Sequence, residues 1–267
     1  MSNRYRIVNG ARFRIADVDP DDTGEYAHHD DAEPKLEEDV KRLARLQERF
    51  YVDRRHGLLV VLQGMDTCGK DGTIEHVFSG VNPQGVSVTP FKKPTADELD
   101  HPYLWRAWRG VPARGHVAIF NRSHYEDVLV VRVHGLVPPA VWKRRFDEIN
   151  AFERYLADNG VIVLKFFLHI SKAEQQERMR ARVRDPEKQW KFNPGDLAER
   201  ARWSQYMRAY QDVVRRCSAP WAPWYVIPAD RKWYRNLVIA DAIVRTLSGL
   251  RLRYPKPDYD PKRVRIP

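Results

Sequence analysis

A glycine-rich segment at residues 63–73 carries the residue types that bind phosphate. Gly64, Gly69 and Lys70 have the spacing G-x-x-x-x-G-K, between a short apolar run and a helical pattern. In such a loop, backbone N–H groups form an anion nest and the dipole of the following helix adds positive potential. Lys70 adds a mobile charge that can follow a phosphoryl group from donor to acceptor. The alternative, an ordinary turn after a strand, does not require this combination of residues.

Two residues of this loop depart from the usual motif. Asp71 stands where Ser or Thr normally supplies a hydroxyl ligand to Mg²⁺. Asp66 lies inside the loop, where a carboxylate repels phosphate unless a cation lies between them. Asp66 is therefore either a metal-organising group or a residue that orients the acceptor phosphate. Phosphate or nucleotide contacts are expected from Gly64, Met65, Thr67, Cys68, Gly69, Asp71, Gly72 and Thr73.

A second polar cluster follows the apolar run at residues 116–120. Its first polar residue is Asn121, where phosphoryl-transfer enzymes often have a carboxylate, and Glu126 and Asp127 come later. Arg122 can neutralise charge on a phosphoryl group in transfer. Carboxylates and water suit Mg²⁺ or Mn²⁺. The alternative is that Glu126 and Asp127 cap the next helix or pair with Arg132.

A basic segment at residues 174–192 has the composition of a phosphate-binding lid. Arg178 and Arg182 are four residues apart, on one face of the predicted helix, and Asp185-Pro186 ends that helix. Guanidinium groups match phosphate oxygens, and closure of a lid excludes water. The alternative is a solvated charged helix.

Basic and aromatic residues also alternate between residues 92 and 114. The residues are Lys92, Lys93, Tyr103, Trp105, Arg106, Trp108, Arg109 and Arg114. Arginines among aromatics are one mark of single-stranded nucleic-acid binding. In the more ordinary interpretation, the aromatics belong to the core and the arginines to the surface.

The elements that must position these residues alternate along the chain. Short apolar runs predict strands at residues 57–63, 85–91, 116–120, 161–168 and 224–227. Amphipathic patterns predict helices at residues 36–52, 140–156, 196–214 and 231–250, the third opened by a capping box from Asp196 to Glu199. This order indicates an α/β fold with a doubly wound parallel sheet. We expect one domain over residues 1–267, with an irregular arm at 1–34 and a lid at about 172–195.

Composition narrows the class of protein further. The chain has 267 residues with a net charge of +10, which favours a polyanionic partner without identifying it. The chain contains no apolar run long enough to span a membrane and no secretory h-region in its first residues. Its two cysteines, Cys68 and Cys217, are far apart in sequence, which fits a reducing cytoplasm.

Together these segments resemble the polyphosphate kinase 2 family. The similar stretches are GMDTCGKDG (64–72), YLWR (103–106), FNRSHYED (120–127), LKFFLHIS (164–171), DPEKQWK (185–191) and APWYVIPA (222–229). The resemblance implies a P-loop kinase-like, thymidylate-kinase-like fold with a helical lid, and Mg²⁺-dependent phosphoryl transfer from polyphosphate to nucleotides. Its partners would be polyphosphate, AMP, ADP and ATP, with assembly into dimers or tetramers and no nucleic acid or membrane.

The resemblance also implies roles for single residues. Asp66, Lys70, Arg122 and Arg178 match the catalytic residues of the family. Many members have Asp where this chain has Asn121, and the form Asn-Arg-Ser-His-Tyr-Glu-Asp at 121–127 is similar to the subgroup that phosphorylates both AMP and ADP.

These roles combine in one hypothesis for the reaction. The metal ion would be held by Asp66, Glu126 and Asp127, and further phosphate contacts would come from Asn121 and Arg182. Polyphosphate would follow a basic channel lined by Lys92, Lys93, Arg106 and Arg132. No covalent intermediate is needed. The alternatives are an ATP-dependent nucleoside monophosphate kinase and a P-loop protein that binds nucleic acid.

Overall fold

A six-stranded sheet in the order β1-β6-β5-β2-β4-β3 organises the molecule. The computed structural model describes residues 1–266. The strands are β1 (Arg6–Ile7), β2 (Gly57–Gln63), β3 (Val86–Pro90), β4 (Val117–Asn121), β5 (Val161–His169) and β6 (Trp224–Pro228). Strands β2 to β6 are parallel to their neighbours, and β1 pairs with β6 in the antiparallel sense. The predicted α/β fold with a mostly parallel sheet is therefore confirmed.

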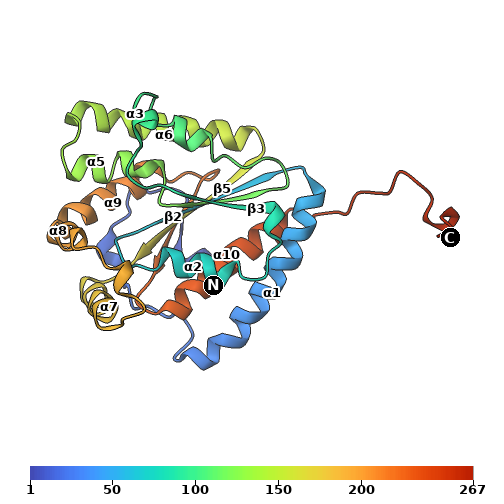
Figure 1. Ribbon diagram of the computed structural model, residues 1–267, viewed down its shortest axis with the longest axis horizontal. Helices are drawn as coiled ribbons and strands as arrows, with labels where there is room; N and C mark the ends of the chain where they lie inside the picture. The colour runs from blue at the N-terminus through green and yellow to red at the C-terminus, as the bar shows by residue number, and fades with distance from the viewer. Residues whose placement is uncertain (267) are drawn as a thin grey trace.

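Helices cover both faces of this sheet (Figure 1). The longer ones are α1 (His29–Asp53), α2 (Lys70–Val77), α6 (Pro139–Asp158), α7 (Lys172–Arg184), α8 (Gly195–Ala201), α9 (Trp203–Cys217) and α10 (Lys232–Gly249). Short turns of helix are α3 (Ala96–Leu99), α4 (Trp105–Trp108) and α5 (Val130–Val133). Helices α1, α2 and α10 lie on one face, and α5, α6 and α9 lie on the other.

The N-terminal segment is more ordered than its polar sequence predicts. Residues 6–7 form the edge strand β1, and α1 begins at His29 rather than near residue 36. The hydroxyl of Tyr5 donates to Asp22 at 2.7 Å and contacts the hydroxyl of Tyr234 on α10 at 2.8 Å. The prediction of an irregular arm over residues 1–34 is therefore wrong for these parts, because tertiary contacts order a segment without strong local signals.

The helix predicted over residues 196–214 is two helices. The backbone of Arg202 leaves the helical region between α8 and α9. The predicted capping box is also wrong, because Asp196 lies inside α8 and the side chain of Asn193 accepts the Gly195 N–H instead. The carboxylate of Glu199 binds the hydroxyl of Tyr206 on α9. The break lets α8 follow the lid while α9 packs on the sheet.

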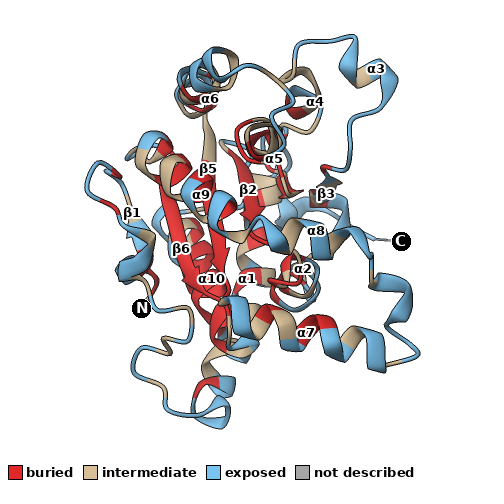
Figure 2. Ribbon diagram, turned by 90° about the vertical axis from the view of Figure 1, so that its left-hand side faces the viewer, coloured by how far each residue is buried: buried red, intermediate tan, exposed pale blue. Residues whose placement is uncertain are grey.

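The central strands are buried on both faces, as Figure 2 shows. A charged side chain lies within this core, because Lys165 on β5 has no exposed surface. Its Nζ donates to Glu153 at 2.5 Å, to the carbonyl oxygen of Cys217 at 2.6 Å and to the hydroxyl of Tyr125 at 2.9 Å. These partners compensate the cost of burying the ammonium group. They also join β5, α6 and α9 to the segment that follows β4.

Beyond α10 the chain leaves the body of the molecule (Figure 1). The start of this tail is held at Asp53, whose carboxylate accepts the N–H of Arg253 at 2.8 Å. Residues 254–266 are exposed and include Tyr254 and Tyr259. Among the described residues, none of the helices combines the length and the apolar character needed to cross a bilayer.

Candidate active site

The loop between β2 and α2 has the backbone shape that its glycines predict. Gly69 precedes α2 with φ at +102°, a conformation that residues with a Cβ rarely adopt. A Cβ at this position would lie 1.9 Å from Nη1 of Arg235, which reaches the loop from α10. Only glycine therefore fits both the turn and its supporting arginine. The backbone N–H groups at the start of α2 are left to face an anion.

The predicted phosphate-binding lysine folds back over this loop. Lys70 is buried, and its Nζ donates to the carbonyl oxygens of Gly64 at 3.0 Å and Met65 at 3.3 Å. The sulfur of Cys68 lies 3.6 Å from the same nitrogen. This places a cation at the centre of the loop.

Arg122 joins the loop to the end of β4. Its Nη2 donates to Oδ1 of Asp66 at 2.5 Å, and its Nη1 lies 3.8 Å from Glu126. The backbone of Arg122 has φ at +62°, and its N–H donates to Leu62 in β2. The local turn thus directs the guanidinium between two carboxylates. Burial raises the pKa of Glu126, while the charges of Arg122 and Lys70 oppose that rise.

The amide of Asn121 contacts the residue that follows the loop lysine. Its Nδ2 donates to Oδ1 of Asp71 at 2.6 Å. Asn121 and Asp71, the two positions where this sequence departs from the usual motifs, therefore meet where β4 ends and α2 begins. An amide at position 121 leaves a single negative charge there, whereas an aspartate would place two carboxylates side by side.

Asp127 lies apart from the other predicted metal ligands. Its Oδ1 accepts a hydrogen bond from Nη1 of Arg145 on α6 at 2.9 Å, and its carbonyl oxygen accepts another at 3.1 Å. Burial raises the pKa of Asp127 to about 6, although Arg145 opposes the rise. Neither acid pairs with Arg132, which binds Asp212 at 2.7 Å instead. The structure therefore brings Glu126 to the loop but engages Asp127 with α6.

Arg178, the first arginine of the predicted lid helix, contacts the backbone of the phosphate loop itself. Arg178 is buried, and its guanidinium donates to Glu174 and to four backbone carbonyl groups, those of Thr67, Cys68, Ala229 and Asp230. This geometry fixes the loop against the end of β6. Arg182, one turn later, forms no hydrogen bond or ion pair with residues 1–266, so its guanidinium is free to bind an anion.

Two residues that support the loop were missed by the sequence analysis. Arg235 is buried, donates from Nη1 to the carbonyl oxygen of Cys68 at 3.1 Å and binds Asn236 through two nitrogens. Burial and the charge of Arg178 lower the pKa of Arg235 to about 10. Gln175 donates to the carbonyl oxygen of Asp66 at 3.0 Å. The spacing of residues in the sequence does not predict these contacts, because they depend on how α7 and α10 pack against the loop.

Two of the four predicted polyphosphate-binding residues are engaged by protein groups, and the other two are exposed. Lys92 and Lys93 are exposed after β3. Arg106 donates to the carbonyl oxygen of Lys92 at 2.9 Å and lies 4.8 Å from the ring centre of Phe91. Arg132, which binds Asp212, also lies 4.5 Å from the ring centre of Trp142.

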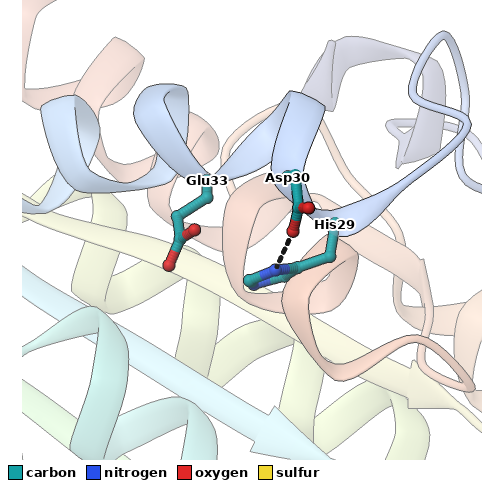
Figure 3. Close-up of side chains that lie close together, drawn as sticks. All are labelled: His29, Asp30 and Glu33. Carbon is teal, nitrogen blue, oxygen red and sulfur yellow. Dashed lines mark hydrogen bonds and ion pairs between the residues drawn. The ribbon is translucent and has the colours of Figure 1, made fainter.

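A cluster of possible metal ligands lies elsewhere, in the first turn of α1. His29, Asp30 and Glu33 offer ligand atoms within 4.8 Å of one another, and Figure 3 shows these exposed side chains. The cluster comes from one helical turn and lacks a buried donor. Sequence analysis assigned no metal to this segment. Among the described residues, the carboxylates at the phosphate loop do not converge as closely.

A glycine-rich loop between a buried parallel strand and a helix, with a central lysine and a basic lid, defines a P-loop phosphotransferase. The family model for polyphosphate kinase 2 matches residues 26–253, and the chain belongs to that family. It is 50% identical over 264 residues to the AMP/ADP-polyphosphate phosphotransferase of Meiothermus ruber, covering 98% of this chain and 99% of the relative.

Two further comparisons agree with this family. The ADP-polyphosphate phosphotransferase of Rhodopseudomonas palustris is 41% identical, over 96% of this chain and 92% of the relative. The crystal structure of polyphosphate kinase 2 from Arthrobacter aurescens TC1 matches with a TM-score of 0.92 and 44% identity, over 96% of this chain and 92% of that chain. The predicted family and the P-loop kinase-like fold are therefore confirmed.

Proposed function

We propose that this enzyme transfers a phosphoryl group from inorganic polyphosphate to AMP and to ADP. The observation that carries the proposal is the contact between Arg122 and Asp66 beside Lys70, which places two cations and one carboxylate at a phosphate loop. The similarity to relatives named for polyphosphate and for AMP or ADP supports the donor and the acceptors. The form of the 121–127 segment supports the use of both acceptors.

The proposed mechanism relies on positioning and charge. Lys70 and Arg122 stabilise negative charge on the phosphoryl group in transfer, and no covalent intermediate forms. Asp66 orients the acceptor phosphate through its contact with Arg122. Arg182 binds the donor from the lid, whereas Arg178 is a positioning residue because protein groups already occupy its guanidinium.

A divalent cation fits the oxygen-rich donor set at this loop. Asp66 lies in the loop, Glu126 in the turn after β4 and Asp71 at the start of α2, so these three segments each carry one carboxylate. Mg²⁺ is favoured because it retains several waters and needs few protein ligands, and Mn²⁺ has similar preferences. The bound ion would neutralise charge on the phosphate oxygens. Asp127 contributes indirectly, through the position of the turn.

The proposal extends to the path of the donor and to assembly. Lys92, Lys93, Arg106 and Arg132 would contact successive phosphates of a chain that extends away from the loop. A basic channel of this kind separates a polyphosphate donor from ATP, which needs fewer cations. We also propose that the enzyme works as a dimer or tetramer, as the family resemblance implies.

The test is ATP formation from ADP, and separately ADP and ATP formation from AMP, with Mg²⁺ and polyphosphate as the sole phosphoryl donor. Products from both acceptors are expected. Product from ADP alone would remove the role proposed for Asn121 but keep the donor. Activity that appears only when ATP replaces polyphosphate would identify a nucleoside monophosphate kinase instead.

A further inference from the structure

A second concave site lies at the opposite end of the sheet from the phosphate loop. It has a volume of about 320 Å³, within the range of small-ligand sites. Its floor is the first half of β5, residues 162–164, and its walls come from the N-terminal segment, the turn before β6 and the end of α10. The phosphate loop follows the carboxyl end of β2, and the pocket lies at the amino end of β5. Because these strands are parallel neighbours, the two sites are at opposite ends of the strands.

Two arginines from distant parts of the chain line this pocket. Arg6 comes from β1 and Arg245 from α10. Neither guanidinium forms an ion pair with a carboxylate among residues 1–266. The nearby acid, Asp241, is buried and accepts the N–H of Ser2 at 2.9 Å. The pocket therefore holds two positive charges that form no direct ion pair with a described carboxylate, and Asp241 is the acid nearest to them that the structure places at this end of α10.

The pocket also offers polar groups between these arginines. The ladder between β5 and β6 begins at Lys165, so residues 162–164 extend past the start of β6 and leave room for the pocket beside them. Tyr225 lies across from Arg6 in the register of β1 and β6. Burial raises the pKa of Tyr225 and the charge of Asp241 adds to that rise, whereas the positive charges of Arg6 and Arg245 oppose it.

We propose that this pocket binds a small phosphate-bearing anion, separately from the catalytic loop. Guanidinium groups bind phosphate oxygens through paired N–H donors, and the hydroxyl of Tyr225 adds a neutral donor. Trp221, which is 40% exposed, forms part of the wall and offers an apolar surface to a group attached to the phosphate. The ligand class thus includes free phosphate, pyrophosphate and nucleoside monophosphates.

Crystals of the full chain soaked in tungstate, a phosphate mimic, give the direct test. Anomalous density between Arg6 and Arg245 is expected in the wild-type protein. That density should be absent from the double variant Arg6→Gln/Arg245→Gln and present in Arg12→Gln, a control at an exposed arginine outside the pocket. Tungstate at the phosphate loop alone, in wild-type crystals, would overturn the proposal.

Titration in solution identifies the ligand and guards against an ion bound only at crystal concentration. Phosphate, pyrophosphate and AMP would each be titrated while hydrogen–deuterium exchange is followed in residues 1–8 and 219–226. Protection there by at least one of the three is expected, with binding at least about tenfold weaker in Arg245→Gln, since it loses a charge-assisted contact. No protection by any of them would contradict the site.

The enzyme activity separates this inference from the proposed function. The double variant should retain ATP formation from ADP at low substrate concentration, because neither arginine lies at the loop. Should the double variant fold poorly, Arg245→Gln alone suffices, as Arg245 is exposed on α10. Loss of the pocket's protection with retained activity supports a separate site, and equal loss of both would show that the pocket belongs to the catalytic machinery.

Discussion

Arg122 and Asp66 are 56 residues apart in sequence, yet the guanidinium of one donates to the carboxylate of the other at 2.5 Å. The contact crosses from the end of β4 to the loop after β2. In the mechanism that we propose, this contact would hold a cation beside the transferred phosphoryl group and would keep the loop carboxylate from repelling that group. The pair is thus one functional unit rather than two independent residues.

We expect Asp66→Asn and Arg122→Gln to be strongly non-additive. Each removes the same contact, so the double variant should lose less kcat/KM than the two single losses predict. A coupling free energy of about 0.5–3 kcal/mol is typical for residues in direct contact. Steady-state kinetics of the four proteins measure it. Additive losses would show that Asp66 acts through the metal alone.

Lys70→Ala should lower ATP formation by at least about 10²–10³-fold, because a preorganised cation at the transferring group is lost. Its far-ultraviolet circular dichroism should match that of the wild-type protein. Lys256→Ala, in the exposed tail, is the control and should keep full activity. Retained turnover in the Lys70 variant would exclude the phosphate loop as the catalytic site.

Arg178 and Arg182 should separate positioning from binding. Arg178→Gln loses charge-assisted hydrogen bonds to buried carbonyl groups and should lower the free energy of unfolding by about 2–4 kcal/mol. Arg182→Gln should leave stability within about 0.5 kcal/mol and raise KM for polyphosphate. Urea unfolding combined with kinetics tests both. A stable Arg178 variant with impaired turnover would restore Arg178 as a catalytic residue.

Burial raises the pKa of Asp127 to about 6, and this predicts that the free energy of unfolding decreases as the pH rises. Between pH 4 and pH 6 the folded state retains a proton that the unfolded state has released, so rising pH favours unfolding. The difference amounts to at most about 3 kcal/mol and is complete above pH 6. Asp127→Asn should remove this fall. Urea unfolding at pH 4.5 and pH 7 measures it, and an unchanged pH dependence would refute the assignment.

Asn121→Asp should make the protein dependent on divalent cations for stability. The variant places a second carboxylate against Asp71, where Nδ2 of Asn121 now donates at 2.6 Å. We expect a loss of about 1 kcal/mol without metal, from like-charge repulsion, and its recovery with Mg²⁺. Thermal unfolding with and without Mg²⁺ tests this, with the wild-type protein as control. A variant that is equally stable without metal would show that the two side chains separate.

Strong local signals explain what the sequence could predict. The run at residues 57–63 is a strand with these same bounds, because a strand buried on both faces must be continuously apolar. The loop after it could also be predicted from a local pattern, because glycine and lysine at this fixed spacing have few other uses. Both signals lie within about fifteen residues of sequence.

The parts that could not be predicted depend on packing between distant segments. The strand β1 has two residues and forms because β6 offers a free edge. Arg178 and Arg182 look alike on a helical wheel, and only the ends of β2 and β6 decide which one is buried. Asp127 was predicted to bind the metal together with Glu126 because both carboxylates follow the strand predicted at residues 116–120, but the turn after β4 directs Asp127 toward Arg145.

The buried ion pair between Lys165 and Glu153 has a consequence for how this sequence can change over time. Loss of either partner leaves one charge enclosed in the core, which costs about 3–5 kcal/mol and exceeds what many domains can lose. Replacement of both by apolar residues of similar volume can be nearly neutral. Lineages that diverge from this chain should therefore keep both residues or change both, so positions 153 and 165 should covary as a pair.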